Sequence, residues 1–167
     1  MLTMFYYSNF QSLLSYGVTF WGASPYAKKL FIVQKKVVRV ISGSFWVDGK
    51  PASCRNLFKD LGFLTLTSLY IYECASFVYE HGSRTNTFQQ HHRYDTRNSH
   101  NKVLPRHQSS LFATQDTYVG SKLFNMLPHK LKISNTTKEF KSNLKILLNT
   151  NAFYTMQEFF KFFNEKK

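Results

Sequence analysis

The stretch AKKLFIVQKKVVRVISG, residues 27–43, predicts an amphipathic helix around which the rest of the chain folds. With a rotation of about 100° per residue, one side collects the apolar residues expected to face a core. They are Leu30, Val33, Val37, Val40 and Ile41, with Phe31 and Val38 beside them. The opposite side collects Lys28, Lys29, Lys35, Lys36 and Arg39, without any acid. Gly43 then tolerates the left-handed backbone that ends many helices.

The composition predicts one folded domain with a large positive charge. Of the 167 residues, 43% are hydrophobic and 17% aromatic, which is enough apolar surface to build a core. Twenty-two Lys and Arg residues outweigh nine Asp and Glu residues, so the formal net charge is +13. Such a field attracts polyanions. The basic side of residues 27–43 is therefore an interface for a polyanion or an acidic protein surface, or else an ordinary solvated lysine face.

The cysteines and the apolar runs indicate where such a chain resides. Cys54 and Cys74 are too few for a disulfide scaffold and lack the spacing of a zinc motif, which favours reduced thiols. No apolar run reaches the roughly 18 residues that span a bilayer. Residues 1–10, MLTMFYYSNF, lack the basic start of a secretory signal. We therefore expect an intracellular protein that is neither secreted nor bound to a membrane.

Helical periods and capping residues predict a mainly α-helical domain of about seven helices. The expected helices run from Ser8 to about Trp21, over 27–43, 53–61, 67–80 and 118–127, and onward from Thr136 and Thr155. The last two begin with capping boxes, because Glu139 and Glu158 follow their threonines by three residues.

A long polar loop, residues 83–116, separates the N-terminal helical part (1–82) from the C-terminal helices (117–167) of the same domain. It lacks a sustained period, although short strands at 102–104 and 110–114, and so a short β-hairpin, are an open alternative. Its basic residues interleave with aromatic rings, as in surfaces that contact RNA or single strands. The expected contacts are Arg84, Arg93, Tyr94, Arg97, Lys102, Arg106 and His107, besides the five cations of residues 27–43. Tyr94 and Arg97 can equally pin the loop to the helices.

No arrangement of residues predicts catalysis or a cofactor. The nine acids are scattered singly, and the sequence has no Gly-rich phosphate loop or nucleophile elbow. Four histidines crowd into the loop: His91, His92, His100 and His107. They could bind a metal or cleave RNA by acid–base chemistry, but their spacing matches no zinc pattern. We expect no catalytic residue, no metal site and no cofactor, with the histidines adding hydrogen-bond donors to the loop.

Several short segments occur in an order that resembles one protein region. They are YGVTFWG (16–22), LFIVQKKVVRVISG (30–43), CRNLFKDLGFLTLTSLYIYECASFV (54–78), YDTRNSH (94–100), LPRH (104–107), YVGSKLFNMLP (118–128), FKSNLKILL (140–148) and FYTMQEFF (153–160). Together they resemble the C-terminal region, after the thumb, of reverse transcriptases (RNA-directed DNA polymerases) from jockey-like non-LTR retrotransposons. The resemblance covers almost the whole chain.

The resemblance implies a fragment of a transposable-element polyprotein that lies outside the polymerase palm. The paired aspartates that hold magnesium in this family have no counterpart here, so no catalytic residue carries over. The implied function is non-catalytic binding of template RNA or target DNA in the nucleus, with the rest of the polyprotein as a partner. The alternative is a structural or interaction remnant that packs on a missing thumb and has no activity of its own.

Overall fold

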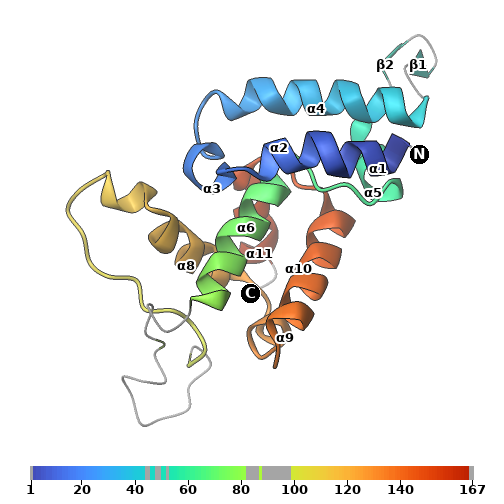
Figure 1. Cartoon of the computed structure of the whole chain (residues 1–167). Helices are drawn as coiled ribbons and strands as arrows, with labels where there is room; N and C mark the ends of the chain where they lie inside the picture. Colours follow the sequence, from blue (N-terminus) through green and yellow to red (C-terminus); the bar gives the residue numbers. More distant parts are fainter. Residues whose placement is uncertain are drawn as a thin grey trace. The chain divides into compact units, whose positions relative to one another are not determined.

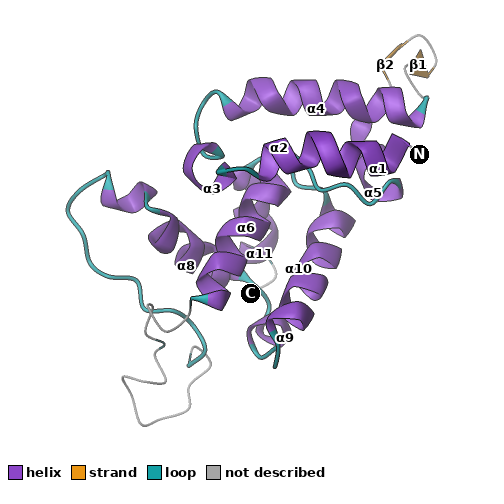
Figure 2. Ribbon diagram, viewed as in Figure 1, coloured by secondary structure: helices purple, strands orange, loops and turns teal. Residues whose placement is uncertain are grey.

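The computed structural model describes residues 2–43, 46–47, 50–51, 53–81, 87 and 99–165. Figure 2 shows that helices make up most of this part of the chain, which confirms the predicted mainly α-helical fold. The chain forms two compact units, one of Met1–Tyr70 with Ile146–Glu158 and one of Ile71–Lys145 with Phe159–Lys167. The predicted division at residues 82 and 116 stays a prediction.

The first unit becomes helical earlier than predicted. Helix α1 (Leu2–Phe5), the π-helical segment η1 (Tyr6–Gln11) and α2 (Ser12–Ser15) follow one another directly. Ser8 is therefore not a helix start, and its hydroxyl donates back to the Phe5 carbonyl within the helix. The helix breaks at Gly17, whose φ of +62° is a left-handed value that suits glycine. Helix α3 (Val18–Trp21) then ends before Gly22, as predicted.

Helix α4 (Ala27–Ser42) is the helix predicted from residues 27–43, and Gly43 follows it with a φ of +66°. Figure 1 shows α4 alongside α1 and α2. The predicted core side is wrong in part, because Leu30, Val33 and Val40 are 40%, 46% and 55% exposed. The residues that α4 buries are Ala27, Gln34 and Val38, while Phe31, Val37 and Ile41 pack against the core from its edge.

Gln34 explains why α4 is rotated away from the predicted side. Its amide nitrogen donates to the Tyr6 hydroxyl and to the Leu64 carbonyl, each at 2.9 Å. The Leu66 backbone N–H donates to the Gln34 amide oxygen, also at 2.9 Å. Burying an amide is tolerable when its polar atoms are paired. These partners come from segments far along the chain, so a helical period alone does not reveal them.

The core of the first unit is a cluster of Tyr6, Val38, Cys54, Phe58, Phe63 and Ala152. The rings of Tyr6 and Phe63 stack with their centroids 3.9 Å apart.

Two short strands and a helix follow α4. Strands β1 (Trp46–Val47) and β2 (Lys50–Pro51) pair antiparallel, with Trp46 opposite Pro51 and Val47 opposite Lys50. Helix α5 (Cys54–Asp60) follows Ser53, as predicted.

Helices α6 (Leu66–Glu80), α10 (Thr137–Asn151) and α11 (Met156–Asn164) each contribute residues to both units. Within the second unit they accompany α8 (Asp116–Met126) and α9 (His129–Lys132). Its buried side chains include Ile71, Cys74, Val78, Leu123, Phe124, Leu131, Phe140, Leu144, Phe159 and Phe163. The rings of Tyr79 and Phe140 stack at 4.1 Å between centroids. Helix α9 was not predicted, because four residues are too few to show a helical period.

Both predicted capping boxes are confirmed. The Glu139 N–H donates to the Thr136 hydroxyl at 3.2 Å, and the Asn135 N–H donates to the Glu139 carboxylate at 3.3 Å. The Glu158 N–H donates to the Thr155 hydroxyl at 3.1 Å, and the Tyr154 N–H donates to the Glu158 carboxylate at 2.9 Å. These pairs satisfy N–H groups that the first turn of a helix leaves without partners.

The strands considered for the loop do not form in residues 99–114. Residues Phe112–Thr114 form a 3-10 turn, in which the Thr114 hydroxyl donates to the Leu111 carbonyl at 2.7 Å. Lys102 forms an isolated antiparallel bridge with Thr87. The strand prediction was therefore wrong for 110–114, because a side chain that bonds its own backbone favours a turn over a ladder.

Candidate nucleic-acid interface

The outer side of α4 carries the predicted cations, and the structure brings all five together on one helix. Lys28, Lys29 and Lys36 are exposed, whereas Lys35 and Arg39 are half-buried. A rotation of about 100° per residue places Lys28 and Arg39 on the same side of the helix about 16 Å apart along its axis, and Lys29 and Lys36 about 10 Å apart in a neighbouring row. Ile32 lies between them and is exposed. The basic face of α4, defined by these five cations, therefore runs along the helix and is interrupted by Ile32.

Aromatic rings hold two of these lysines. The Lys35 ammonium lies 4.8 Å from the centroid of the Phe31 ring and 5.6 Å from that of the Tyr154 ring. The Lys29 ammonium lies 5.5 Å from the Tyr26 ring centroid. A cation over a ring keeps its charge while losing some of its freedom. These contacts pre-orient Lys29 and Lys35 without neutralising them.

The cations of α4 stand in a segment without negative charge. Residues 1–47 contain no Asp or Glu. In the described part of the chain, Lys28, Lys29 and Lys36 form no ion pair with a carboxylate, and the ion pairs found there include Arg55–Glu158, Lys141–Glu80 and Lys161–Glu165. The positive field of these three lysines is therefore directed at solvent or at a partner.

Cys54 lies beneath the basic face and remains a neutral thiol. Burial raises the pKa of the Cys54 thiol, although the nearby charges of Arg39 and Lys35 act in the opposite direction. Its sulfur contacts the Lys35 carbonyl at 3.7 Å. A buried neutral thiol behaves as a small core residue, so Cys54 adds no charge to the face above it.

Three exposed aromatic residues lie between the end of α2 and the start of α4, and sequence reasoning missed them. Tyr16, Phe20 and Tyr26 are 85%, 80% and 72% exposed. Exposed rings beside cations are the elements with which proteins stack and hold single-stranded bases. The absence of acids from residues 1–47 marks this segment as basic and aromatic, but it does not show which of its rings are exposed.

Most of the predicted loop contacts lie outside the described residues. These are Arg84, Arg93, Tyr94 and Arg97, together with the histidines His91 and His92. Their assignment to nucleic-acid binding stays a prediction, and so does the alternative in which Tyr94 and Arg97 pin the loop.

Lys102 is buried and packs within the second unit, whereas the sequence predicted an exposed phosphate contact. It is only 8% exposed, and its ammonium lies 5.8 Å from the Phe124 ring centroid. Asn125 clamps its backbone: the Lys102 N–H donates to the Asn125 amide oxygen at 2.7 Å, and the Asn125 amide nitrogen donates to the Lys102 carbonyl at 2.8 Å. Burial lowers the pKa of the Lys102 ammonium. We therefore leave Lys102 out of the candidate interface.

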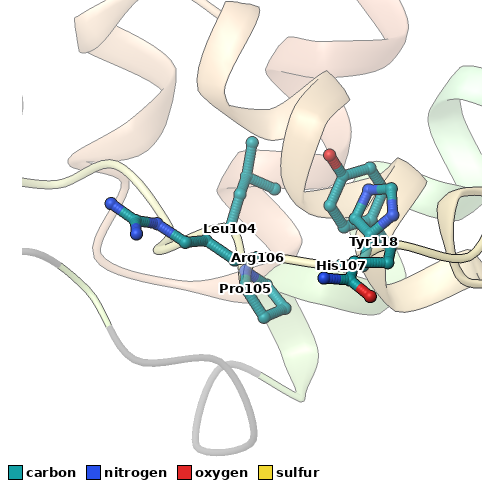
Figure 3. Close-up of a pocket in the computed structure, with 6 residues that line it drawn as sticks. Leu104, Pro105, Arg106, His107 and Tyr118 are labelled. Atoms are coloured by element: carbon teal, nitrogen blue, oxygen red, sulfur yellow. The ribbon is translucent and has the colours of Figure 1, made fainter.

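Arg106 and His107 line a pocket of about 730 Å³, together with Leu104, Pro105, Gln108 and Tyr118. Figure 3 shows the Arg106 guanidinium pointing away from the ring pair of His107 and Tyr118. Those two rings meet edge to face, with centroids 4.6 Å apart, and His107 Nδ1 lies 3.0 Å from the Ser109 carbonyl. His107 thus anchors the loop to α8, while Arg106 is exposed and can reach an anion.

The remaining described histidines do not assemble a metal site. The rings of His100 and His129 meet edge to face, with centroids 5.2 Å apart. Within the part of the chain that the structure describes, no group of three His, Cys, Asp or Glu side chains could hold a metal ion. In the same residues, no helix combines the length and the hydropathy needed to cross a bilayer.

Comparisons with known proteins identify no relative of this chain. Neither a family model, nor a curated protein, nor a solved structure matches this chain.

Proposed function

We propose that this chain is a non-catalytic nucleic-acid-binding module, the C-terminal fragment of a non-LTR retrotransposon reverse transcriptase without its palm. The observation that carries the binding proposal is the basic face of α4, on which Lys28, Lys29 and Lys36 are exposed and form no ion pair with a described carboxylate. The order of the segments quoted above supports the origin in a reverse transcriptase.

Phosphate groups are the ligand that suits this face. Nucleic acids present a regular array of negative charges, and each phosphate that a lysine neutralises releases a bound counterion. The exposed rings of Tyr16, Phe20 and Tyr26 lie in the same acid-free segment and favour RNA or unpaired DNA, because only unstacked bases offer their faces to a ring.

The proposed activity is binding alone. The sequence scatters its acids singly, and the described carboxylates of Glu80, Glu158 and Glu165 are engaged in ion pairs with lysine or arginine. We therefore assign no reaction step to this chain.

The salt dependence of binding tests the proposal. The affinity of the chain for a fluorescein-labelled single-stranded RNA, measured by anisotropy, should fall with a slope of log K against log salt of about −4 for five phosphate contacts. The triple variant Lys28→Gln, Lys29→Gln, Lys36→Gln should reduce the magnitude of that slope by about 2 to 3. An affinity that does not respond to salt would refute the proposal.

A matched control separates the basic face from net charge. The variant Lys59→Gln, Lys130→Gln, Lys138→Gln removes the same number of exposed cations from other places on the chain. It should lower the affinity much less than the α4 variant, because its lysines do not lie on one helix face. Equal losses in the two variants would mean that α4 has no special role.

The second candidate function is that of an interaction remnant, and the exposed apolar residues of α1 favour it. Leu2, Met4 and Phe5 are all more than half exposed. A chain that has lost the domain covering them should aggregate through this surface. Size-exclusion chromatography and thermal melting test this candidate, and a monodisperse monomer that melts cooperatively would contradict it.

A further inference from the structure

Helix α4 has an apolar stripe that the first unit leaves largely exposed. It consists of Leu30, Val33, Val37 and Val40, and we name it the α4 seam. Leu30, Val33 and Val40 are exposed, and Val37 lies half-buried at the edge of the core. The core side of α4 is a different set, centred on Gln34 and Val38, which are fully buried. The apolar arc of α4 is therefore wider than the surface that the unit covers.

The spacing of the α4 seam is that of a helix-pairing surface. Its members follow one another at intervals of three, four and three residues, which is the a/d pattern of two consecutive heptads. Such a stripe runs straight along the helix for roughly 15 Å, about three turns. An apolar ridge of this width and length fits the groove of a second helix better than a flat or extended partner.

The margins of the α4 seam define the charge of that second helix. Lys29 and Lys36 precede Leu30 and Val37 and so occupy the flanking g positions of the heptads. Both are exposed. The other margin is Gln34 and Ile41, which face the core of the unit. A partner helix that packs on the α4 seam therefore meets Lys29 and Lys36 along the exposed margin of the seam. Their charge favours Asp or Glu at the flanking positions of the partner helix.

A second copy of this chain does not offer those acids. In an antiparallel pair, the g positions of the two helices face one another, so Lys29 and Lys36 would oppose the same lysines of the copy. In a parallel pair, the lysines would face Gln34 and Ile41 of the copy, neither of which is negative. Each chain also carries a net charge of +13, and like charges oppose association.

We propose that the α4 seam docks an amphipathic helix of another protein, one whose apolar stripe is flanked by acidic residues. The apolar side chains supply the contact area, and Lys29 with Lys36 selects the partner and its register. The inference shares Lys29 and Lys36 with the proposed nucleic-acid interface, so its test uses the chain in the absence of nucleic acid.

Two labelled peptides test the proposal. Both are helices of about 21 residues with the same leucine a/d stripe; one has Glu at the flanking positions and the other has Lys. Fluorescence anisotropy with the full chain, in the absence of nucleic acid, should show binding of the Glu peptide and at least about tenfold weaker binding of the Lys peptide. Equal binding of the two would overturn the proposal.

Variants of exposed residues locate the site without threatening the fold. Val33→Gln with Val40→Gln should weaken binding of the Glu peptide by about tenfold or more, because it makes the seam polar. Lys29→Glu with Lys36→Glu should reverse the preference toward the Lys peptide. The matched control Lys28→Glu with Lys59→Glu makes the same change in net charge away from the seam, and it should keep the original preference.

Further outcomes count against the proposal. A Val33→Gln, Val40→Gln chain that binds the Glu peptide as tightly as the unaltered chain would show that the seam is not the site. A self-associated chain in sedimentation velocity that this variant converts to a monomer would make a second copy the occupant and would overturn the proposal. Circular dichroism of each variant confirms that a loss of binding is not a loss of helix.

Discussion

The side chains of Gln34 and Tyr6 form a buried hydrogen bond across 28 positions of sequence, with the Gln34 amide nitrogen donating to the Tyr6 hydroxyl at 2.9 Å. Both residues are almost fully buried. Burial raises the pKa of Tyr6 to about 12, although the bond from Gln34 acts in the opposite direction. The hydroxyl is therefore neutral at physiological pH. Because Gln34 also bonds the backbone of Leu64 and Leu66, one side chain joins three segments.

Replacing Gln34 should destabilise the first unit. Gln34→Met keeps the side-chain volume but leaves the Leu64 carbonyl and the Leu66 N–H buried without partners, so the free energy of unfolding should fall by about 2 to 4 kcal/mol. Urea denaturation followed by circular dichroism measures it. Gln157→Met, at an exposed position of α11, should change the value by less than about 0.5 kcal/mol. Similar results for both variants would contradict the role assigned to Gln34.

The ion pair between Arg55 and Glu158 should make stability depend on acid pH. Burial alone would raise the pKa of Glu158, but the bonds from the Tyr154 N–H and from Arg55 outweigh it and lower the pKa below 4.5. The stabilising contribution is therefore complete above pH 4.5 and is lost as the pH falls through the lower folded-state pKa. The pair is partly exposed, so its contribution should not exceed about 1 kcal/mol.

Thermal melts of the unaltered chain and of Glu158→Gln check this dependence. The unaltered chain should be the more stable of the two at pH 7, and the difference should shrink toward pH 3 as Glu158 becomes protonated. Glu165→Gln is the control, because Glu165, directly after α11, forms an exposed ion pair with Lys161 of that helix at 3.7 Å. A Glu158→Gln difference that stays constant from pH 7 to pH 3 would contradict the assignment.

Gly120 should not tolerate a side chain, although it lies inside a helix. A Cβ atom at this position would come within 2.6 Å of the Cys74 carbonyl oxygen and of the Val78 side chain. Alanine favours helices by up to about 1 kcal/mol over glycine, but overpacking against a backbone carbonyl costs about 1 to 3 kcal/mol. Gly120→Ala should therefore lower the free energy of unfolding in urea, whereas Lys122→Ala, at an exposed position of the same helix, should not.

Substituting Lys102 should leave the salt dependence of RNA binding unchanged, whereas substituting Lys28 should weaken it, although both residues were predicted as phosphate contacts. Lys102→Met keeps the apolar stem and the backbone clamp by Asn125, so the salt slope of RNA binding should not change. Lys28→Gln removes an exposed cation of the basic face, so the magnitude of the slope should fall by about 0.7 to 0.9. A Lys102→Met chain whose slope falls as much as that of Lys28→Gln would return Lys102 to the interface.

Sequence reasoning located the elements whose signals are local. The helix at residues 27–43 was predicted with its Gly43 end, because a helical period and a left-handed glycine depend on near neighbours. The two capping boxes were predicted for the same reason, since threonine and glutamate three residues apart bond within one turn. The start of α1 was missed because no capping residue precedes it, and the turn at 112–114 was mistaken for a strand.

The candidate interface was predicted in part. The five cations of α4 lie on one helix face, as expected from their spacing, but the burial of Lys102 depends on Phe124 and Asn125, which lie more than twenty residues away. The exposed rings of Tyr16 and Phe20 were missed, because a sequence does not reveal which aromatic residues a core leaves out.

The sequence by itself determined the positive charge, the helical class, the position of α4 and the caps of α10 and α11, because each depends on composition or on residues within a turn of one another. Only the tertiary structure decided which side of α4 is buried. The apolar arc of α4 is wider than the surface that covers it, and the partners that bring Gln34 into the core come from Tyr6, Leu64 and Leu66. The α4 seam is exposed because the side of α4 that contains Gln34 is the buried one.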